Sequence, residues 1–190
     1  MISDQLSTGL PDDVFVTDGL LTKRPLRAFA LAMLAPRPGE LLWDLGAGTG
    51  SIALEWCRLG ADLRAVAVER SPERAQRITE NAATLGVTDR VDVVVAVTED
   101  ALAELPRPDA VFFGGGIELA LLDQARAALP SGGRLTAHAV TIESEQLLLT
   151  AYRQWGGELT RIAVEHAEPI GRFAGFTPAR TVTCWSLLIG

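Results

Sequence analysis

The 190-residue sequence is poor in side chains that bind metals or form covalent cross-links, with two cysteines, two histidines and one tyrosine. Cys57 and Cys184 are too few for a disulfide framework or a zinc cluster. Free cysteines usually pack as small apolar side chains, so we expect both to be buried in a protein of the reducing cytoplasm. Two histidines are too few for a His-rich metal site, and the sequence predicts no metal.

Long apolar runs and an excess of positive charge are also missing. No apolar stretch approaches the ~20 residues of a membrane-spanning helix, and residues 1–9 lack the pattern of a signal peptide. The formal net charge of −7 disfavours broad attraction to nucleic acids or anionic membranes. We therefore expect no membrane or nucleic-acid partner, and any anionic ligand must meet a local group of basic residues.

The chain instead contains a regular alternation of apolar segments with helix-forming ones. Residues 1–190 are interpreted as one domain with a lead-in and first helix (1–39), cofactor-binding βα units (40–155), and C-terminal strands with a substrate-side loop (156–190). Strands are predicted at 40–45, 63–68, 91–97, 109–113, 134–140, 159–165 and 181–188. Helices are predicted at 22–34, 51–59, 72–85, 100–104, 117–128 and 143–155, with Thr22 and Ser71 as N-caps.

Repeated βα units predict an α/β fold with a doubly wound parallel sheet. The last two predicted strands have no helix between them, and Pro169, Gly171, Gly175 and Pro178 interrupt the segment that joins them. We interpret this segment as a loop and the two strands as an antiparallel hairpin at one sheet edge. The prediction is a seven-stranded, mostly parallel sheet.

A glycine-rich turn follows the first predicted strand. Gly46, Gly48 and Gly50 occupy alternate positions before a helix. Glycine tolerates positive φ and has no Cβ, so such a turn lets the backbone approach a ligand at the helix N-terminus. The spacing is GxGxG rather than GxGxxG, because Ser51 stands where a dinucleotide-binding turn needs its third glycine. This spacing disfavours a nicotinamide oxidoreductase, although a glycine turn can also be only a turn.

Two acids accompany the turn. Asp44 ends the first strand and Glu69 ends the second, where an acid can accept hydrogen bonds from ribose hydroxyls. Together with the turn they resemble the S-adenosylmethionine site of class I methyltransferases, which have a Rossmann-like fold. The resemblance implies that Asp44 meets the methionine ammonium and that the adenine lies near Val97 and Thr98. The expected cofactor-binding residues are Thr22, Asp44, Gly46, Ala47, Gly48, Thr49, Gly50, Glu69, Val97, Thr98 and Gly114.

Further motifs resemble the corrin-pathway methyltransferases that act on carbon 15. The lead-in elements GLPDDVF (9–15) and LTK (21–23) discriminate best, since the glycine motif is common to many methyltransferases. The resemblance continues through LWDLGAGTGS (42–51), VERSPE (68–73), DAVFFGG (109–115), GGRL (132–135) and AVTIE (139–143). The closing PIGRFAGFTP (169–178) is similar to the C-terminal half of bifunctional members, whose separate N-terminal domain methylates carbon 5.

The resemblance implies methylation of carbon 15 of a precorrin macrocycle, coupled to decarboxylation of the carbon-12 acetate side chain, in cobalamin biosynthesis. It also implies a homotetramer. A class I methyltransferase with another target and a non-catalytic cofactor-binding module stay open as alternatives. No Asn/Asp-Pro-Pro-Tyr/Phe sequence follows the fourth strand, which argues against enzymes that methylate nucleobase or glutamine amino groups.

A precorrin carries several carboxylates, so the acidic chain needs a local basic cluster to bind it. The expected substrate-binding residues are Lys23, Arg24, Arg27, Gly115, Gly116, Arg172 and Arg180. Each of these charges could also be an ordinary solvated one. No residue is firmly assigned as catalytic; His138, at the end of the fifth strand, is a weak acid/base candidate, and the alternative is a satisfied core histidine.

Overall fold

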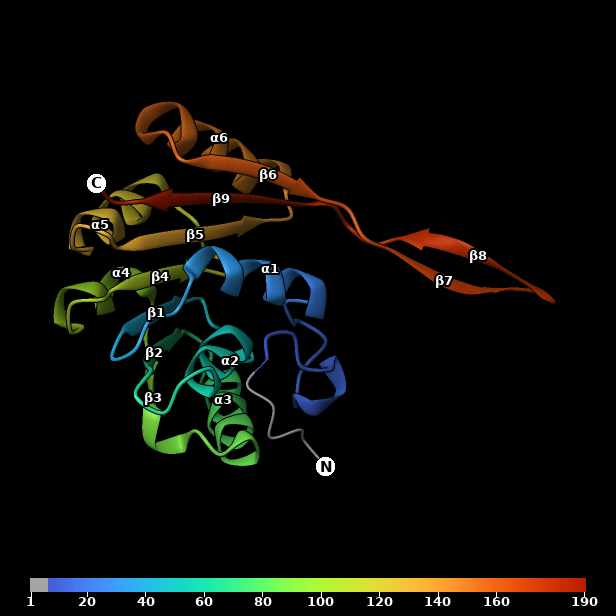
Figure 1. The fold of residues 1–190 in the computed structure, drawn as a ribbon, viewed down its shortest axis with the longest axis horizontal. Helices are drawn as coiled ribbons and strands as arrows, with labels where there is room; N and C mark the ends of the chain where they lie inside the picture. The colour runs from blue at the N-terminus through green and yellow to red at the C-terminus, as the bar shows by residue number, and fades with distance from the viewer. Residues whose placement is uncertain (1–6) are drawn as a thin grey trace.

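A seven-stranded sheet runs through the computed structural model, which describes residues 7–190 (Figure 1). Its strands, in the spatial order β3-β2-β1-β4-β5-β9-β6, are β1 (Leu41–Leu45), β2 (Arg64–Glu69), β3 (Val91–Val95), β4 (Ala110–Phe113), β5 (Arg134–Ala139), β6 (Glu158–Ile162) and β9 (Val182–Leu188). Strands β1 to β5 are parallel, and β9 lies antiparallel between β5 and β6. The predicted α/β fold with a seven-stranded, mostly parallel sheet is confirmed.

Helices cover both faces of the sheet (Figure 1). One face carries α1 (Arg24–Leu34), α2 (Ser51–Arg58) and α3 (Pro72–Leu85); the other carries α4 (Thr98–Ala101), α5 (Leu119–Ala128) and α6 (Ile142–Trp155). Short 3₁₀ turns are η1 (Asp12–Val14), η2 (Thr88–Arg90) and η3 (Leu102–Glu104). Because side chains alternate along β1, Leu42 packs in the first core and Trp43 in the second. None of the described helices has the length and hydropathy needed to span a bilayer.

The helix starts test the predicted caps. Ser71 caps α3 as predicted, and its hydroxyl accepts a hydrogen bond from the backbone of Arg74 at 3.4 Å. Thr22 as the cap of α1 is wrong: the capping position is Lys23, which makes no side-chain cap bond. The Thr22 carbonyl instead accepts a hydrogen bond from Arg27 Nη1 at 2.5 Å, which places Thr22 in the segment before the helix. Cys57 and Cys184 are both free and buried, as expected.

The segment between β6 and β9 differs from the predicted loop. It forms a second hairpin of β7 (Glu165–Ile170) and β8 (Phe173–Pro178), which projects from the body of the protein (Figure 1). Pro169 is compatible with β7 because a two-stranded sheet consists of edge strands only, where a missing N–H can face solvent. The predicted antiparallel pairing of the last two main-sheet strands at one sheet edge is confirmed, with β9 beside β5 and β6 at the edge.

Candidate active site

Two hollows meet where the parallel strands end. The larger, of about 550 Å³, is bordered by the turn after β1, the end of β5, the segment before α1 and the base of the β7–β8 hairpin. The smaller, of about 250 Å³, lies beyond the ends of β2 and β3. Gly46 lines both hollows, so a ligand lying along the glycine turn can extend from one into the other. Ligands of open α/β sheets bind at this end of the strands.

The glycine turn needs its glycines for steric reasons. Gly46 has a φ of +69°, and a Cβ added there would lie 2.9 Å from the carbonyl oxygen of Gly115. A Cβ on Gly50 would lie 2.7 Å from Ile78 Cγ2, in contact with α3. The backbone amides of Gly46 and Ala47 both donate to the Val68 carbonyl at 3.0 Å. The turn is therefore fixed between two strands and a helix, and its backbone forms the wall of the cleft.

Asp44 lies on the wall of the larger cleft and is 1% exposed. Its Oδ2 accepts a hydrogen bond from the backbone amide of Ala53, in the first turn of α2, at 3.1 Å. Burial raises the pKa of Asp44 to about 7; the Ala53 hydrogen bond opposes that shift, and the charge of Glu69 adds to it. A cation in the cleft would favour the ionised form of this carboxyl.

Glu69 lies in the smaller hollow, at the end of β2. Its Oε2 accepts a hydrogen bond from the amide of Gly48 at 2.9 Å, and its Oε1 accepts one from the amide of Ser71 at 2.9 Å. These bonds fix the carboxylate between the glycine turn and the start of α3. Each carboxylate oxygen retains capacity for a further donor, such as a ligand hydroxyl. Val97 and Thr98 line the same hollow, as the expected adenine position requires.

The structure divides the remaining glycines between the two hollows. Gly114 lines the larger cleft. Gly115 and Gly116 line the smaller one together with Glu69, so within this chain they lie on the expected cofactor side rather than the substrate side. Their backbone is brought there because the Gly115 carbonyl lies against the glycine turn at Gly46.

The expected basic cluster is only partly assembled. Lys23 and Arg180 line the larger cleft, whereas Arg24 does not and its backbone amide donates to Asp12 at 3.0 Å. His166 and Ala179, at the base of the hairpin, also line it and were not predicted. No sequence motif marks either residue, because their positions depend on how the two sides of the hairpin pair.

Arg27 as a substrate-binding residue is wrong. Its side chain is 0% exposed, and its Nε donates to Glu55 at 2.7 Å. Its other nitrogens donate to Asp12, to the Thr22 carbonyl and to the Leu10 carbonyl. With Glu55 also accepting from the amides of Gly9 and Leu10, Arg27 joins the lead-in segment to α2. A buried, fully paired guanidinium is structural here and unavailable to a ligand.

Arg172 lies far from this chain's own cleft. It occupies the turn between β7 and β8, at the distal end of the projecting hairpin, where its guanidinium stacks 5.0 Å from the ring of Phe173 (Figure 1). The expectation that Arg172 lies in a substrate-side loop at the cleft is therefore wrong within one chain. Only the base of the hairpin reaches the cleft.

His138 is on the wall of the larger cleft, near the end of β5. It is 7% exposed, and neither ring nitrogen has a hydrogen-bond partner within residues 7–190. Its ring meets the ring of Phe112 edge-on, with the centroids 5.2 Å apart. Burial lowers the pKa of His138 to about 4, so the imidazole is neutral at pH 7. It is therefore neither a satisfied core histidine nor a charged acid.

The strand order and the cleft at the ends of the parallel strands define a class I methyltransferase fold. A solved S-adenosylmethionine-dependent O-methyltransferase from Thermotoga maritima shares this fold with a TM-score of 0.71 at 19% identity. The chain belongs to the precorrin methyltransferase domain family, whose model it matches over residues 13–188. This confirms the family indicated by the sequence motifs.

Individual relatives support the assignment. Over 182 residues the chain is 48% identical to the precorrin-6Y C(5,15)-methyltransferase (decarboxylating) of a Sinorhizobium species, covering 95% of this chain and 44% of that relative. The chain thus spans less than half the length of that protein. It is 35% identical to a probable cobalt-precorrin-6B C(15)-methyltransferase (decarboxylating) of Pyrobaculum calidifontis, with 92% of each chain covered. The crystal structure of the C-terminal domain of precorrin-6Y C5,15-methyltransferase from Rhodobacter capsulatus matches with a TM-score of 0.90 and 44% identity, covering 96% of this chain and 98% of that domain.

Proposed function

We propose that the chain is a single domain that uses S-adenosylmethionine to methylate carbon 15 of a precorrin macrocycle, with decarboxylation of the carbon-12 acetate side chain. The observation that carries this proposal is that two neighbouring hollows share Gly46 of the glycine turn as a lining residue. The smaller hollow contains Glu69, the proposed ribose acceptor, and the larger cleft has room for part of a second ligand. The relatives named as decarboxylating precorrin methyltransferases support the choice of acceptor.

The residues present suit the proposed methyl donor. Asp44 would pair with the methionine ammonium, and the first turn of α2 would face the carboxylate. Glu69 would accept hydrogen bonds from the ribose hydroxyls, and Val97 and Thr98 would lie beside the adenine. The donor supplies an electrophilic methyl group when it is bound.

The chain itself would contribute binding, alignment and exclusion of water. Lys23 and Arg180 would pair with carboxylates of the acceptor at the wider end of the cleft. Phe112, Val140 and Val182 give the cleft an apolar wall, which would remove water from a carboxylate held against it. Holding an acceptor carbon in line with the methyl group is worth effective molarities of ~10⁵–10⁸ M, so no nucleophilic side chain is required.

We also propose that the protein acts as a cytoplasmic homo-oligomer, a tetramer by family resemblance, and that an N-terminal domain methylates carbon 5 in its bifunctional form. The β7–β8 hairpin supports association, because an isolated two-stranded sheet is marginal in water. Three of its large apolar side chains, Ile170, Phe173 and Phe176, are between 65% and 74% exposed. Burying them against a second copy would remove that exposed apolar surface.

Turnover tests the proposal. The chain is incubated with a precorrin bearing the carbon-12 acetate and a methyl donor labelled on its methyl group, and the product is analysed by mass spectrometry. The expected product has gained the label and lost carbon dioxide. A labelled product that keeps the acetate would remove the decarboxylation, and an unlabelled acceptor would overturn the proposed activity.

A further inference from the structure

The segment 16–22, which we call the strap, crosses beside the glycine turn before the chain enters α1. Residues Gly19 to Thr22 line the larger cleft. The Leu20 carbonyl lies 4.0 Å from the position that a Cβ would take on Gly48, and the Leu20 side chain is 61% exposed. The strap is thus the part of the lead-in that borders the proposed methyl-donor site.

One end of the strap is fastened by buried groups. Asn81, which is 0% exposed, accepts from the amide of Val16 at 2.7 Å and donates to the Val16 carbonyl at 3.0 Å. The same amide nitrogen of Asn81 lies 3.2 Å from the Thr49 carbonyl, in the glycine turn. The opposite end is held by Arg27 through the Thr22 carbonyl. Within the strap, these contacts involve only Val16 and Thr22, at its two ends, and do not include Asp18, Gly19 or Leu20 in its middle.

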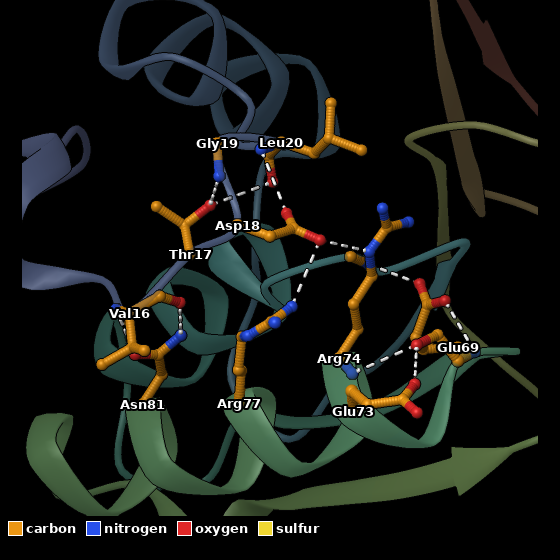
Figure 2. Close-up of polar contacts among 12 residues, drawn as sticks. Val16, Thr17, Asp18, Gly19, Leu20, Glu69, Glu73, Arg74, Arg77 and Asn81 are labelled. Carbon is orange, nitrogen blue, oxygen red and sulfur yellow. Dashed lines mark hydrogen bonds and ion pairs between the residues drawn. The ribbon is translucent and has the colours of Figure 1, made fainter.

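The middle is held by an ion-pair cluster of Asp18 with two arginines of α3 (Figure 2). Asp18 Oδ2 accepts from Arg74 Nε at 2.8 Å and from Arg77 Nη1 at 3.2 Å, while its Oδ1 accepts from the amide of Leu20 at 3.2 Å. In Figure 2 the Asp18 carboxylate faces both arginines and the Leu20 side chain points away from them. Asp18 therefore couples the conformation of the turn at Gly19 and Leu20 to α3.

The cluster differs from the buried anchors in its exposure. The three side chains are 27% to 29% exposed, so solvent and salt reach them. The hydrogen bond from Arg74 holds the pKa of the Asp18 carboxyl below its usual range, which keeps it charged around neutral pH. Partly exposed ion pairs are weak and are screened by salt, whereas Asn81 and Arg27, which hold the two ends, are themselves 0% exposed. The strap can therefore open at its middle while both ends stay attached.

We infer that Asp18, Arg74 and Arg77 are positioning residues that hold the strap closed beside the glycine turn and so control how fast the S-adenosyl ligand leaves its site. The inference rests on the proposed function, because it takes that ligand to occupy the site along the glycine turn. Opening of the Asp18 cluster lets Gly19 and Leu20 move away from the turn. Release of spent S-adenosylhomocysteine then follows without disturbance of the core.

The test measures the dissociation rate of S-adenosylhomocysteine by surface plasmon resonance at about 50 and about 500 mM KCl, where the Debye length falls several-fold. Asp18→Asn removes the charge but keeps an oxygen for the Leu20 amide. We expect it to raise the dissociation rate about fivefold at low salt, as expected for two partly exposed ion pairs. Wild-type dissociation should accelerate with salt, whereas that of Asp18→Asn should not. Arg77→Gln, which removes only the 3.2 Å contact, should give an intermediate rate.

The matched control is Asp123→Asn, which breaks an exposed ion pair with Arg126 on α5, outside both hollows. It should leave the rate and its salt dependence unchanged. The inference is overturned if Asp18→Asn dissociates at the wild-type rate with the wild-type salt dependence, or if Asp123→Asn accelerates equally. A wild-type chain that binds no S-adenosylhomocysteine would contradict the proposed function itself. Failure of the strap inference alone would instead leave wild-type binding intact.

Discussion

The two sides of the site differ in how completely the protein satisfies its own polar groups. On the β1–β2 side, Asp44 and Glu69 are each held by backbone amides of the glycine turn or an adjoining helix. On the β5–β9 side, His138 has no hydrogen-bond partner among the described residues, and the nearby hairpin projects away from the sheet. The first side is preorganised by its own backbone, whereas the second leaves the ring nitrogens of His138 unpaired within residues 7–190.

Removal of the most firmly held acid should have the largest effect. Glu69→Ala deletes two hydrogen bonds that fix the glycine turn and the proposed ribose acceptor. We expect the affinity for S-adenosylhomocysteine, measured by titration calorimetry, to fall about 30-fold, which corresponds to ~2 kcal/mol for hydrogen bonds to a charged group. The control is Glu73→Ala, since Glu73 accepts from the Ser71 hydroxyl and lies outside both hollows. Unchanged affinity in Glu69→Ala would contradict the ribose assignment.

The titration of Asp44 gives a second test of the preorganised side. Its pKa is raised to about 7, so the carboxyl becomes neutral as the pH falls below that value and loses its attraction for an ammonium group. We expect the affinity for S-adenosylhomocysteine to drop about tenfold between about pH 8 and pH 6, as the ionised fraction falls. Asp44→Asn should bind weakly with little dependence on pH. A wild-type affinity that is constant across this range would contradict the pairing.

Arg180 tests the less complete side. We expect Arg180→Ala to raise the KM for the precorrin by about tenfold, the loss of one charge-assisted hydrogen bond, while the affinity for the methyl donor stays unchanged. Arg153→Ala removes an exposed charge from α6, outside the cleft, and serves as the control. Steady-state kinetics with separate titration of each substrate distinguish the effects. Loss of methyl-donor affinity in Arg180→Ala would contradict the assignment of Arg180 to the precorrin and would indicate that it contacts the methyl donor.

Replacement of His138 should have the smallest effect of the four, and it should stabilise the folded protein. Its ring nitrogens are buried and have no hydrogen-bond partner among residues 7–190, which costs the folded protein ~1–3 kcal/mol per group. His138→Phe keeps an aromatic ring and removes both nitrogens, so we expect the free energy of unfolding in urea to rise by about 1 kcal/mol while precorrin turnover falls. The companion variant Phe112→Leu changes the neighbouring ring and should only destabilise. A destabilised His138→Phe protein would contradict the interpretation of His138 as a buried group without hydrogen-bond partners.

The difference between the two sides also explains what the sequence could predict. Asp44, the three glycines and Glu69 lie within 26 consecutive positions of one βαβ unit, so spacing and backbone chemistry are enough to place them together. The strands and helices around them agree with the prediction to within a few residues. Local sequence patterns are informative where local geometry builds the site.

The residues that the sequence misplaced depend on contacts that no local pattern encodes. In the sequence Arg27 has no visible partner, whereas in the structure it is buried in an ion pair with Glu55 of another helix. Arg172 is expected at the cleft as one member of a basic cluster, in a loop around Pro169 and Gly175, whereas β7 and β8 pair and extend away from the cleft (Figure 1). Gly115 and Gly116 face the smaller hollow because β4 lies beside β1 in the sheet.

Titration of the chain with S-adenosylhomocysteine and, separately, with NADH tests the central claim most directly, because both ligands carry an adenosine but only one resembles a methyl donor. The GxGxG turn with Asp44 before it and Glu69 beyond it predicts heat of binding with S-adenosylhomocysteine and none with NADH. Binding of NADH without binding of S-adenosylhomocysteine would contradict the account.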